Sequence, residues 1–512
     1  MRLWASLFLL LPMAVRADEL PAKITELIDR PEYKQARWGI LFVDAKTGRT
    51  VYERDQERLY TPASTTKLYS CAAALGELGA DYRFKTPVHQ RGVLKDGTLK
   101  GDLILVASGD LTFGGRRGKD GAVQFTSGDH TYANSGLSET KLTDSDPLAG
   151  IDDLAAQVAK AGIRTVTGEI LIDDRLFEHA RGSGSGPDLL TPIMVNDNVL
   201  DIVVMPGEKP GAPAKITVRP DTRYFPIDAV VTTAAEGKLP QLTLLETGGN
   251  TLTIRGEVAC KSQPMIRVYQ VGDPALFARA LFIESLRRHG VEVTASLFQP
   301  GSADLPAKAE YAKLPKVAEH VSAPLADALK VTLKVSHNLY ASTLPLLVAT
   351  KHNERTLTQG LQRQGTFLKG LGVLVETISF AGGAGGMQAD MITPAATVKL
   401  IGEMAKRSDA SAYFDALPII GVDGTLATVV PEDSPVKGKV QAKTGTLVFY
   451  DAMNSRMLLK SKALAGRMTT KTGTELYFAV FLNDMPLATG DTAGNQGKAI
   501  GKLCEIMHQY GP

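Results

Sequence analysis

The 512-residue sequence contains few cysteines, and their positions exclude a disulfide framework. Only Cys71, Cys260 and Cys504 occur, far apart in the chain, whereas disulfide-stabilised proteins are small and dense in cysteine. Cys71 and Cys504 lie on apolar faces of expected helices, so we expect buried thiols. The hydrophobic content of 44% and the charged content of 22% are those of a globular protein. The length predicts two or three domains.

The sequence also lacks an excess of one charge and a long apolar run. Lys and Arg number 57 and Asp and Glu 55, a net charge of +2, which excludes nucleic acid as a dominant partner. No segment reaches the roughly 20 apolar residues of a membrane-spanning helix. The apolar run from Leu3 to Val15 follows an arginine and precedes small residues, as in a signal peptide. We therefore expect cleavage of residues 1–17 near Ala17, export to the periplasm, and no transmembrane anchor after cleavage.

Hydrophobic periodicity indicates helices and strands at both ends of the chain. Strand-like runs at 37–43 and 50–53 flank a glycine-containing turn, which is typical of a β-hairpin. A helix should follow, with Pro62 in its first turn and Gly79 at its end. Three strand candidates lie near the C-terminus, at 440–443, 463–470 and 476–482. A last amphipathic helix then contains Cys504.

The middle of the chain has a different pattern. Residues 84–297 contain mostly short β runs, and helical periodicity returns over 325–349. The simplest topology is α+β, in which a helix-plus-sheet domain made of residues 18–83 and 298–512 is split by a large, mostly β insertion. Within the insertion, residues 114–146 lack periodicity and are rich in Gly, Ser, Thr, Asp and Asn, which predicts a long mobile loop.

Ser64 and Lys67 lie one helical turn apart at the expected helix start. Their side chains should project from the same face, and a buried lysine with a lowered pKa can accept the proton of a serine nucleophile. The free N–H groups of a helix N-terminus could also stabilise an oxyanion. By itself, however, S-x-x-K occurs in many proteins in which the serine only caps a helix.

A second short motif, S-x-N, is formed by Ser336 and Asn338. It lies in or between two expected helices, where a hydroxyl and an amide could face one cleft. Considered alone, the tripeptide is better explained as a polar helix junction.

A third motif, Lys443-Thr444-Gly445-Thr446, follows a strand candidate. The glycine would let a substrate backbone approach the strand closely, and the lysine could bind a carboxylate. This motif alone is also weak, because a second K-T-G begins at Lys471.

Together the motifs follow the order S-x-x-K, S-x-N, K-T-G, which is the signature of penicillin-binding proteins and serine β-lactamases. More closely, the sequence resembles the low-molecular-mass class C penicillin-binding proteins, the D-alanyl-D-alanine carboxypeptidase/endopeptidase family. The resemblance covers nearly the whole chain after residue 17. It is clearest in Thr61–Lys67, Ala107–Asp110, Val195–Asn198, Ser336–Ala341, Gly421–Leu426, Ala442–Leu447 and Ala463–Gly466.

This resemblance implies a penicillin-binding, β-lactamase-like domain with an antiparallel sheet, split after the active-serine helix by a β-rich insertion. It implies that Ser64 is the nucleophile and Lys67 its base. Ser336 would relay a proton to the leaving amine, and Asn338 would bind the acyl-side amide of the substrate.

The resemblance also implies a substrate and how it is held. Peptidoglycan stem peptides would be cut at D-alanyl bonds through an acyl-enzyme, and β-lactams would be covalent inhibitors; no cofactor is implied. Lys443 would bind the terminal carboxylate beside Thr444 and Gly445, and the N–H groups of Ser64 and Thr446 would form the oxyanion hole.

Two segments depart from the family pattern. The family has Asp-Gly-Ser-Gly-Leu-Ser before a Thr-Pro helix start, whereas residues 382–387 are Gly-Gly-Ala-Gly-Gly-Met, so the polar contacts usually made there should be lost. Residues 448–462 form a longer stretch than the family has at this place. Either change could alter substrate choice or weaken activity.

Other functions stay open at this point. A serine β-lactamase uses the same motifs, but it is a single compact domain with no use for the insertion. A non-catalytic peptidoglycan-binding or β-lactam-sensing protein could keep the fold. A Ser-His-Asp hydrolase is disfavoured because G-x-S-x-G is absent, and no HExxH or Cys/His cluster indicates a metal.

The two K-T-G copies give a first testable prediction. We expect Lys443→Ala to impair turnover of carboxylate-terminated substrates strongly, because Lys443 ends the strand that matches the family. Lys471 should lie in a hairpin turn and point into water, so Lys471→Ala should change the free energy of unfolding by at most about 0.5 kcal/mol. Steady-state kinetics and denaturant unfolding of both variants test this. An inactive Lys471→Ala would show that the strand assignment is wrong.

Overall fold

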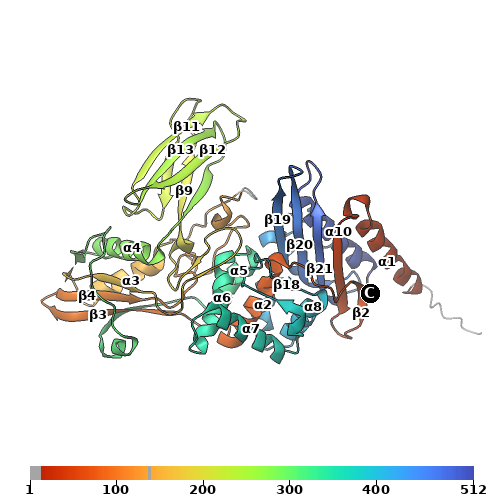
Figure 1. Ribbon diagram of the computed structural model, residues 1–512, viewed down its shortest axis with the longest axis horizontal. Coiled ribbons are helices and arrows are strands. Elements are labelled where there is room, and N and C mark those ends of the chain that lie inside the picture. The colour runs from red at the N-terminus through yellow and green to blue at the C-terminus, as the bar shows by residue number, and fades with distance from the viewer. Residues whose placement is uncertain (1–12, 136–139) are drawn as a thin grey trace, which may run out of the picture. The chain divides into compact units, whose positions relative to one another are not determined.

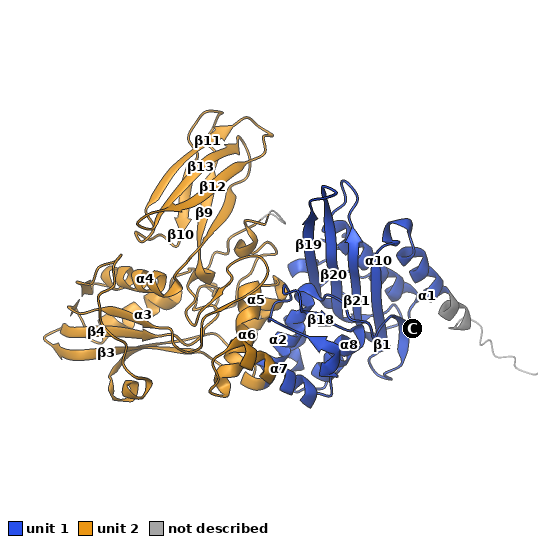
Figure 2. Cartoon of the chain, in the orientation of Figure 1, with its two compact units in different colours: residues 1–76, 364–512 blue, residues 77–363 orange. Residues whose placement is uncertain are grey.

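The computed structural model describes residues 13–135 and 140–512 (Figure 1). The chain forms two compact units (Figure 2). Unit 1 consists of the residues up to Gly76 together with Gln364–Pro512, and unit 2 consists of Glu77–Arg363. The domain boundaries expected at residues 84 and 297 stay a prediction.

Unit 1 is built on a five-stranded antiparallel sheet with the strand order β19-β20-β21-β1-β2. Its strands are β1 (Arg37–Asp44), β2 (Thr50–Arg54), β19 (Val440–Asp451), β20 (Arg456–Thr469) and β21 (Glu475–Pro486). Its helices are α1 (Met13–Ile28), α2 (Lys67–Leu78), α8 (Pro394–Ala405), α9 (Ala410–Phe414) and α10 (Ala493–Tyr510). Its short 3-10 turns and strands are η1 (Pro31–Tyr33), η2 (Ala63–Thr66), η6 (Val375–Thr377), β17 (Ile378–Ser379), β18 (Met391–Ile392) and η7 (Gly424–Leu426).

Helices cover both faces of this sheet. α1 and α10 share one apolar core with alternate strand residues such as Leu464, Phe478 and Val480. The intervening positions point to the opposite face, where α8 brings Gly402 against the Tyr477 ring. Cys504 is buried in the first of these layers, as expected from its helix face.

Unit 2 contains a six-stranded sheet, two three-stranded sheets and a two-stranded one. The six-stranded sheet comprises β3 (Lys85–Lys95), β4 (Thr98–Val106), β5 (Thr165–Val166), β6 (Ile170–Asp173), β15 (Glu292–Val293) and β16 (Lys316–Val321). The smaller sheets comprise β9 (Val199–Met205), β10 (Lys215–Arg219) and β14 (Met265–Gln270); β11 (Ile227–Ala234), β12 (Gln241–Thr247) and β13 (Thr251–Ala259); and β7 (Ala180–Arg181) with β8 (Leu189–Leu190). Its helices and 3-10 turns are η3 (His130–Tyr132), α3 (Ala149–Lys160), η4 (Asn196–Asn198), α4 (Pro274–Arg288), η5 (Lys308–Lys313), α5 (Leu325–Lys334) and α6 (Asn338–Lys351).

The mixture of helices with largely antiparallel sheets, in which only β11 with β13 and the pairs formed among β4, β5, β6 and β15 are parallel among the described strands, confirms the expected α+β class. The helical run over 325–349 consists of α5 and α6 with the S-x-N motif at their junction, as one of the two expected positions had it. Two other elements were not expected. α7 (Leu357–Gly370) has no clear signal in its mostly polar sequence. The unusual stretch 448–462 continues β19 and β20 into one long hairpin.

The segment 114–146, expected to be a mobile loop, contains buried side chains. Arg116, Asp129 and His130 are 5%, 2% and 6% exposed, and Asp129 caps the short helix η3. Polar side chains that indicate a solvated loop in the sequence are here partners of one another. Among the described residues of this segment, 114–135 and 140–146, we therefore expect mobility in the exposed stretch around residues 117–122. Residues 136–139 of the expected loop lie outside the described residues.

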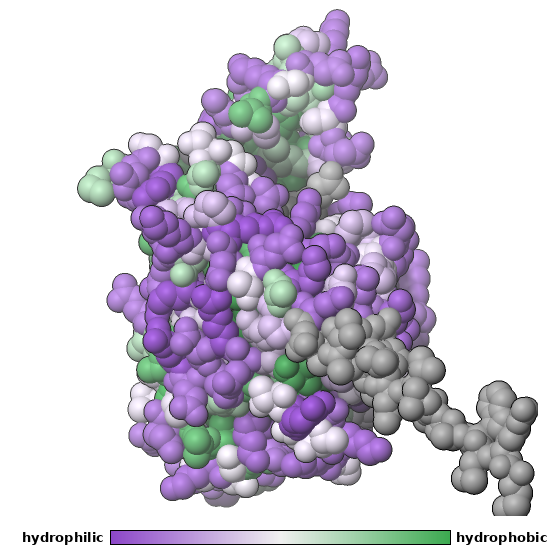
Figure 3. Space-filling model, turned by 90° about the vertical axis from the view of Figure 1, so that its right-hand side faces the viewer, coloured by the Kyte–Doolittle hydropathy of each residue, from purple (hydrophilic) through white to green (hydrophobic). Residues whose placement is uncertain are grey.

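Most of the signal peptide expected at residues 1–17 lies outside the described residues. Residues 1–12 lie outside the described residues, and α1 begins at Met13. None of the described helices has the length and hydropathy needed to cross a membrane. The face shown in Figure 3 is mostly hydrophilic, and its apolar residues appear singly or in small groups.

The restricted mobility can be tested by limited trypsin digestion. Within 114–146 we expect early cleavage after Arg117 or Lys119, which are exposed, because proteases cut exposed, locally mobile backbone. The neighbouring Arg116 is a built-in control, because its buried ion pairs should protect it until the unit unfolds. Mass spectrometry of the first fragments decides; fragments ending at Arg116 at early times would contradict the description.

Candidate active site

Ser64 and Lys67 lie in unit 1, where the 3-10 turn η2 leads into α2. Lys67 Nζ donates a hydrogen bond to Ser64 Oγ over 2.8 Å and another to the carbonyl of Ala384 over 3.1 Å. The Lys67 side chain is 0% exposed. The S-x-x-K motif therefore forms a direct serine–lysine pair, with the serine on the tight turn just before the α-helix.

The backbone before Ser64 has an uncommon conformation. Ala63 has a φ of +45°, and non-glycine residues stay in this region only where neighbours hold them there. The sheet supplies such contacts at Thr61. Its N–H donates to Asn483 Oδ1 over 2.7 Å, and its carbonyl accepts from Ser461 Oγ over 2.7 Å. No local pattern in the sequence predicts these contacts, because Asn483 is 422 positions away.

Burial controls the charge of the two lysines at this place. It lowers the pKa of Lys67 to about 7, although the nearby Cys71 and Asp390 act in the opposite direction. Burial, and next the neighbouring Lys67, hold the pKa of Lys443 well below its usual value. Lys67 can therefore be neutral near pH 7, which is the state in which an amine accepts a proton.

The K-T-G segment lies on β19, an edge strand of the sheet. A Cβ at Gly445 would lie 2.5 Å from the Pro62 carbonyl oxygen and 3.3 Å from Ala63 Cβ, so only glycine permits this approach. The nearest atom to such a Cβ is the carbonyl oxygen of the chain's own Pro62, and the approach of a substrate backbone to Gly445 stays a prediction. Lys443 Nζ donates to the carbonyl of Thr444 over 2.8 Å.

The hydroxyl groups of Thr444 and Thr446 each form a hydrogen bond with a neighbouring side chain. Thr444 Oγ1 donates to Thr425 Oγ1 over 2.7 Å, and Lys462 Nζ donates to Thr446 Oγ1 over 2.8 Å. Burial lowers the pKa of Lys462 to about 8. Lys462 belongs to the stretch that departs from the family pattern, and sequence patterns alone did not mark it.

The glycine-rich segment 382–387 packs against the Ser64 turn. Gly385 has a φ of +91°, and a Cβ there would lie 1.8 Å from a carbonyl oxygen of that turn. Ser70 Oγ donates to the Gly383 carbonyl over 2.7 Å, and Lys67 donates to the Ala384 carbonyl. Polar contacts are therefore made here through backbone carbonyls, and the expected loss of the family's side-chain contacts stays a prediction.

Ser336 and Asn338 lie in unit 2, at the break between α5 and α6. Ser336 has a φ of +65°, and its carbonyl accepts a hydrogen bond from the Tyr132 hydroxyl. Asn338 Nδ2 donates to the carbonyl of Ser185 over 2.9 Å. Both side chains are buried. The S-x-N motif is therefore a fixed turn that begins α6, held by contacts within unit 2.

The second K-T-G copy lies where the sequence predicted it, in the turn between β20 and β21. Gly473 has a φ of +91°, and Lys471 is exposed. Lys443 pairs with Ala465 on β20, so about 20 Å of strand separates it from the turn. Lys471 therefore lies away from Ser64.

Comparisons with known proteins agree with this geometry. The model of the D-Ala-D-Ala carboxypeptidase 3 (S13) family matches residues 20–503. The D-alanyl-D-alanine carboxypeptidase of Actinomadura sp. (strain R39) is 28% identical over 460 residues, which cover 86% of this chain and 78% of that protein. The D-alanyl-D-alanine carboxypeptidase DacB of Haemophilus influenzae is 25% identical over 457 residues, covering 85% and 83%.

A solved structure shares the fold. The crystal structure of penicillin binding protein 4 from Haemophilus influenzae superposes with a TM-score of 0.70 at 22% identity, covering 95% of this chain and 99% of that one. Since the family model spans nearly the full length and the Ser64–Lys67 pair is in place, the chain belongs to the D-Ala-D-Ala carboxypeptidase 3 (S13) family.

Proposed function

We propose that the protein hydrolyses D-alanyl-D-alanine at the end of peptidoglycan stem peptides as a serine carboxypeptidase, and D-alanyl cross-links as an endopeptidase. The observation that carries this is the 2.8 Å hydrogen bond between Ser64 Oγ and the fully buried Lys67 Nζ. Family membership favours a peptidase over the β-lactamase and the non-catalytic protein left open by the sequence.

The first half of the reaction is acylation of Ser64. Neutral Lys67 Nζ takes the proton from Ser64 Oγ, which forms a bond to the carbonyl carbon of the penultimate D-alanine. The backbone N–H groups of Ser64 and Thr446 stabilise the oxyanion. The C–N bond to the leaving residue then breaks as Ser336 gives its hydroxyl proton to the leaving amine, and the proton held by Lys67 restores the Ser336 hydroxyl. Water completes the cycle by hydrolysing the ester, and Ser64 recovers its proton.

The remaining site residues bind the substrate in this proposal. Lys443, on the strand beside Thr444 and Gly445, binds the terminal carboxylate. Asn338 binds the amide on the acyl side. These roles rest on the family resemblance and on the burial that fixes both lysines.

The same nucleophile should react with β-lactams, whose strained amide replaces the D-alanyl bond. The Haemophilus influenzae penicillin binding protein 4 was also solved in complex with a novel β-lactam, and that structure has a TM-score of 0.68 at 21% identity. We also propose export to the periplasm with cleavage near Ala17, which would remove the first residues of α1.

Replacing the nucleophile tests the assignment directly. Ser64→Ala should abolish both peptide turnover and labelling by a fluorescent penicillin, with a loss of several powers of ten, about 10⁶ in the best-studied serine hydrolase. Ser411→Ala, at an exposed serine of α9, is the matched control and should label normally. Covalent labelling of Ser64→Ala at the wild-type rate would refute the nucleophile.

The lowered pKa of Lys67 predicts a pH dependence. Below pH 7 the amine is protonated and cannot accept the serine proton, so the acylation rate should rise with pH, with a midpoint near the pKa of about 7, and then level off. Stopped-flow acylation by penicillin from pH 5 to 9 measures this. Lys67→Arg, which stays charged throughout, should be inactive at every pH. A flat wild-type profile would contradict the general-base role.

A further inference from the structure

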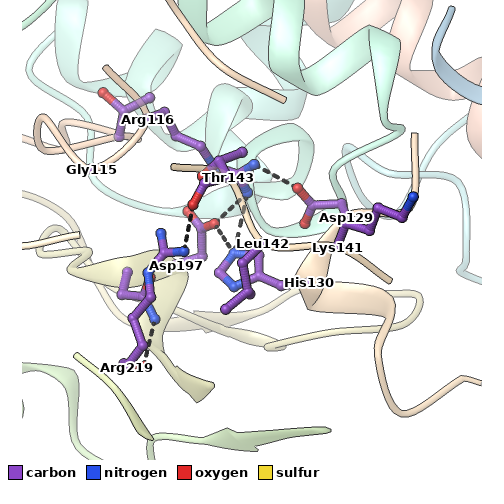
Figure 4. Close-up of a pocket in the computed structure, with 11 residues that line it drawn as sticks. Gly115, Arg116, Asp129, His130, Lys141, Leu142, Thr143, Asp197 and Arg219 are labelled. Atoms are coloured by element: carbon purple, nitrogen blue, oxygen red, sulfur yellow. Dashed lines mark hydrogen bonds and ion pairs between the residues drawn. The ribbon is translucent and has the colours of Figure 1, made fainter. Parts of the chain in front are cut away.

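A cluster of buried charged residues lies in unit 2 next to the Ser336 turn. It is centred on Asp197, whose Oδ2 accepts hydrogen bonds from Arg116 Nη2 and from His130 Nε2, the latter over 2.7 Å. Arg116 Nη1 also donates to Asp129 Oδ2 over 2.6 Å, and His130 Nδ1 lies 2.6 Å from Asp201 Oδ1. We call these five residues the Asp197 cluster. Figure 4 shows Arg116, Asp129, His130 and Asp197 joined by these interactions.

The Asp197 cluster contains charges of both signs. Both ring nitrogens of His130 face carboxylates, so the imidazole holds both protons. Burial alone would lower its pKa, but Asp201 and Asp129 raise the pKa of His130 to about 10. Arg116 supplies a second positive charge, and Arg219 Nε lies 3.9 Å from Asp201. With Arg219, which lies outside these five residues, three cations face three carboxylates. Burying these charges costs desolvation energy, which their mutual attraction and hydrogen bonds offset.

Three consecutive residues around Asp197 have an uncommon backbone conformation. Asn196, Asp197 and Asn198 have φ values of +49°, +53° and +56°. Asn and Asp tolerate this left-handed region better than other residues with a Cβ. Consecutive outliers of this kind persist only where the surroundings hold them and are concentrated at functional sites. The sequence Val195–Asn198 matched the family, but its use was not evident from the sequence.

Two contacts join the Asp197 cluster to α6. The Tyr340 hydroxyl donates to Asp197 Oδ1, and its ring stacks on His337 with centroids 3.8 Å apart. His337 Nδ1 accepts the Tyr340 backbone N–H over 3.3 Å, so the neutral ring carries its proton on Nε2. That nitrogen lies 3.4 Å from Asp197 Oδ2. The residue between Ser336 and Asn338 therefore has a fixed tautomer and a fixed ring plane.

A third contact reaches Ser336 itself. Asp129 accepts a hydrogen bond from the Thr131 backbone N–H and so caps η3. The last residue of η3, Tyr132, donates its hydroxyl hydrogen bond to the Ser336 carbonyl. This contact holds the peptide plane that follows Ser336, whose φ of +65° is unfavourable for a serine.

A metal ion is not the best explanation of this cluster. Ligand atoms of Asp129, Asp197 and His337 lie within 4.8 Å of one another. However, His337 Nε2 carries a proton, and a metal would have to replace it. Both carboxylates also already bind Arg116. The donor set is arranged for a network of hydrogen bonds.

We propose that Tyr132 and the Asp197 cluster are positioning residues for Ser336, and that the insertion thereby sets the orientation of the proton relay. The inference rests on the proposed function, in which Ser336 passes a proton to the leaving amine. A relay must be correctly oriented in the transition state, whereas substrate affinity depends on other groups. Loss of positioning should therefore lower kcat and leave KM nearly unchanged.

The test uses Tyr132→Phe, which removes a single oxygen atom. Asp197→Asn is less informative, because it would leave buried cations without their carboxylate and destabilise the whole unit. Tyr311→Phe is the matched control, because the Tyr311 hydroxyl also donates a hydrogen bond within unit 2, to Asp173 Oδ2 over 2.7 Å, away from the Ser336 turn. Turnover of a D-Ala-D-Ala peptide is measured per active site, counted by stoichiometric labelling with fluorescent penicillin.

For Tyr132→Phe we expect a kcat about 10- to 100-fold lower, the range that a misplacement of about 1 Å can cause. KM should change by less than about twofold, because substrate affinity depends on other groups. Tyr311→Phe should have the kcat and KM of the wild type. A merely structural role would lower the melting temperature or the labelled fraction, but not kcat per labelled site.

Ser336→Ala distinguishes a failure of the positioning role of Tyr132 from a failure of the relay role of Ser336. If Ser336→Ala is inactive while Tyr132→Phe keeps wild-type kcat, the positioning inference is wrong and the proposed function stands. If Ser336→Ala itself turns over at the wild-type rate, the relay role is wrong, and the inference falls with it.

Discussion

A buried amine can be neutral near pH 7 only where water is excluded and its hydrogen bonds are still made. Lys67 is such an amine, and unit 1 must exclude water around it while its hydrogen bonds are made. Its side chain is 0% exposed, and its hydrogen bonds go to Ser64 and to a backbone carbonyl of the glycine-rich segment. Backbone must therefore approach from two sides, which explains why Gly445 and Gly385 stand where any Cβ would collide. The departure from the family at 382–387 keeps this packing with backbone carbonyl groups.

Local signals in the sequence predicted the features that depend on neighbours along the chain. The spacing of Ser64 and Lys67 predicted the pair, and the turn residues placed Lys471 on a hairpin. The change of hydrophobic periodicity along the chain indicated the split topology, and the family resemblance supplied the roles proposed for the site residues.

Features that depend on distant residues could not be predicted in this way. Thr61 and Asn483 are 422 positions apart, and hydrogen bonds over such separations leave no periodic pattern. Composition was misleading for 114–146, because a solvated loop and a buried ionic network use the same polar residues. Burial distinguishes a solvated loop from a buried ionic network. It depends here on the contact between Arg116 and Asp197, which are 81 positions apart, and so it cannot be read from the local sequence.

The Asp197 cluster also constrains the order in which the protein can assemble. Arg116 and Asp197 are 81 positions apart, and Tyr132 and Ser336 are 204 positions apart. Contacts over such separations form only when long loops have closed. The strained Ser336 turn therefore depends on the folded insertion for its order, and not on its own neighbours in the chain.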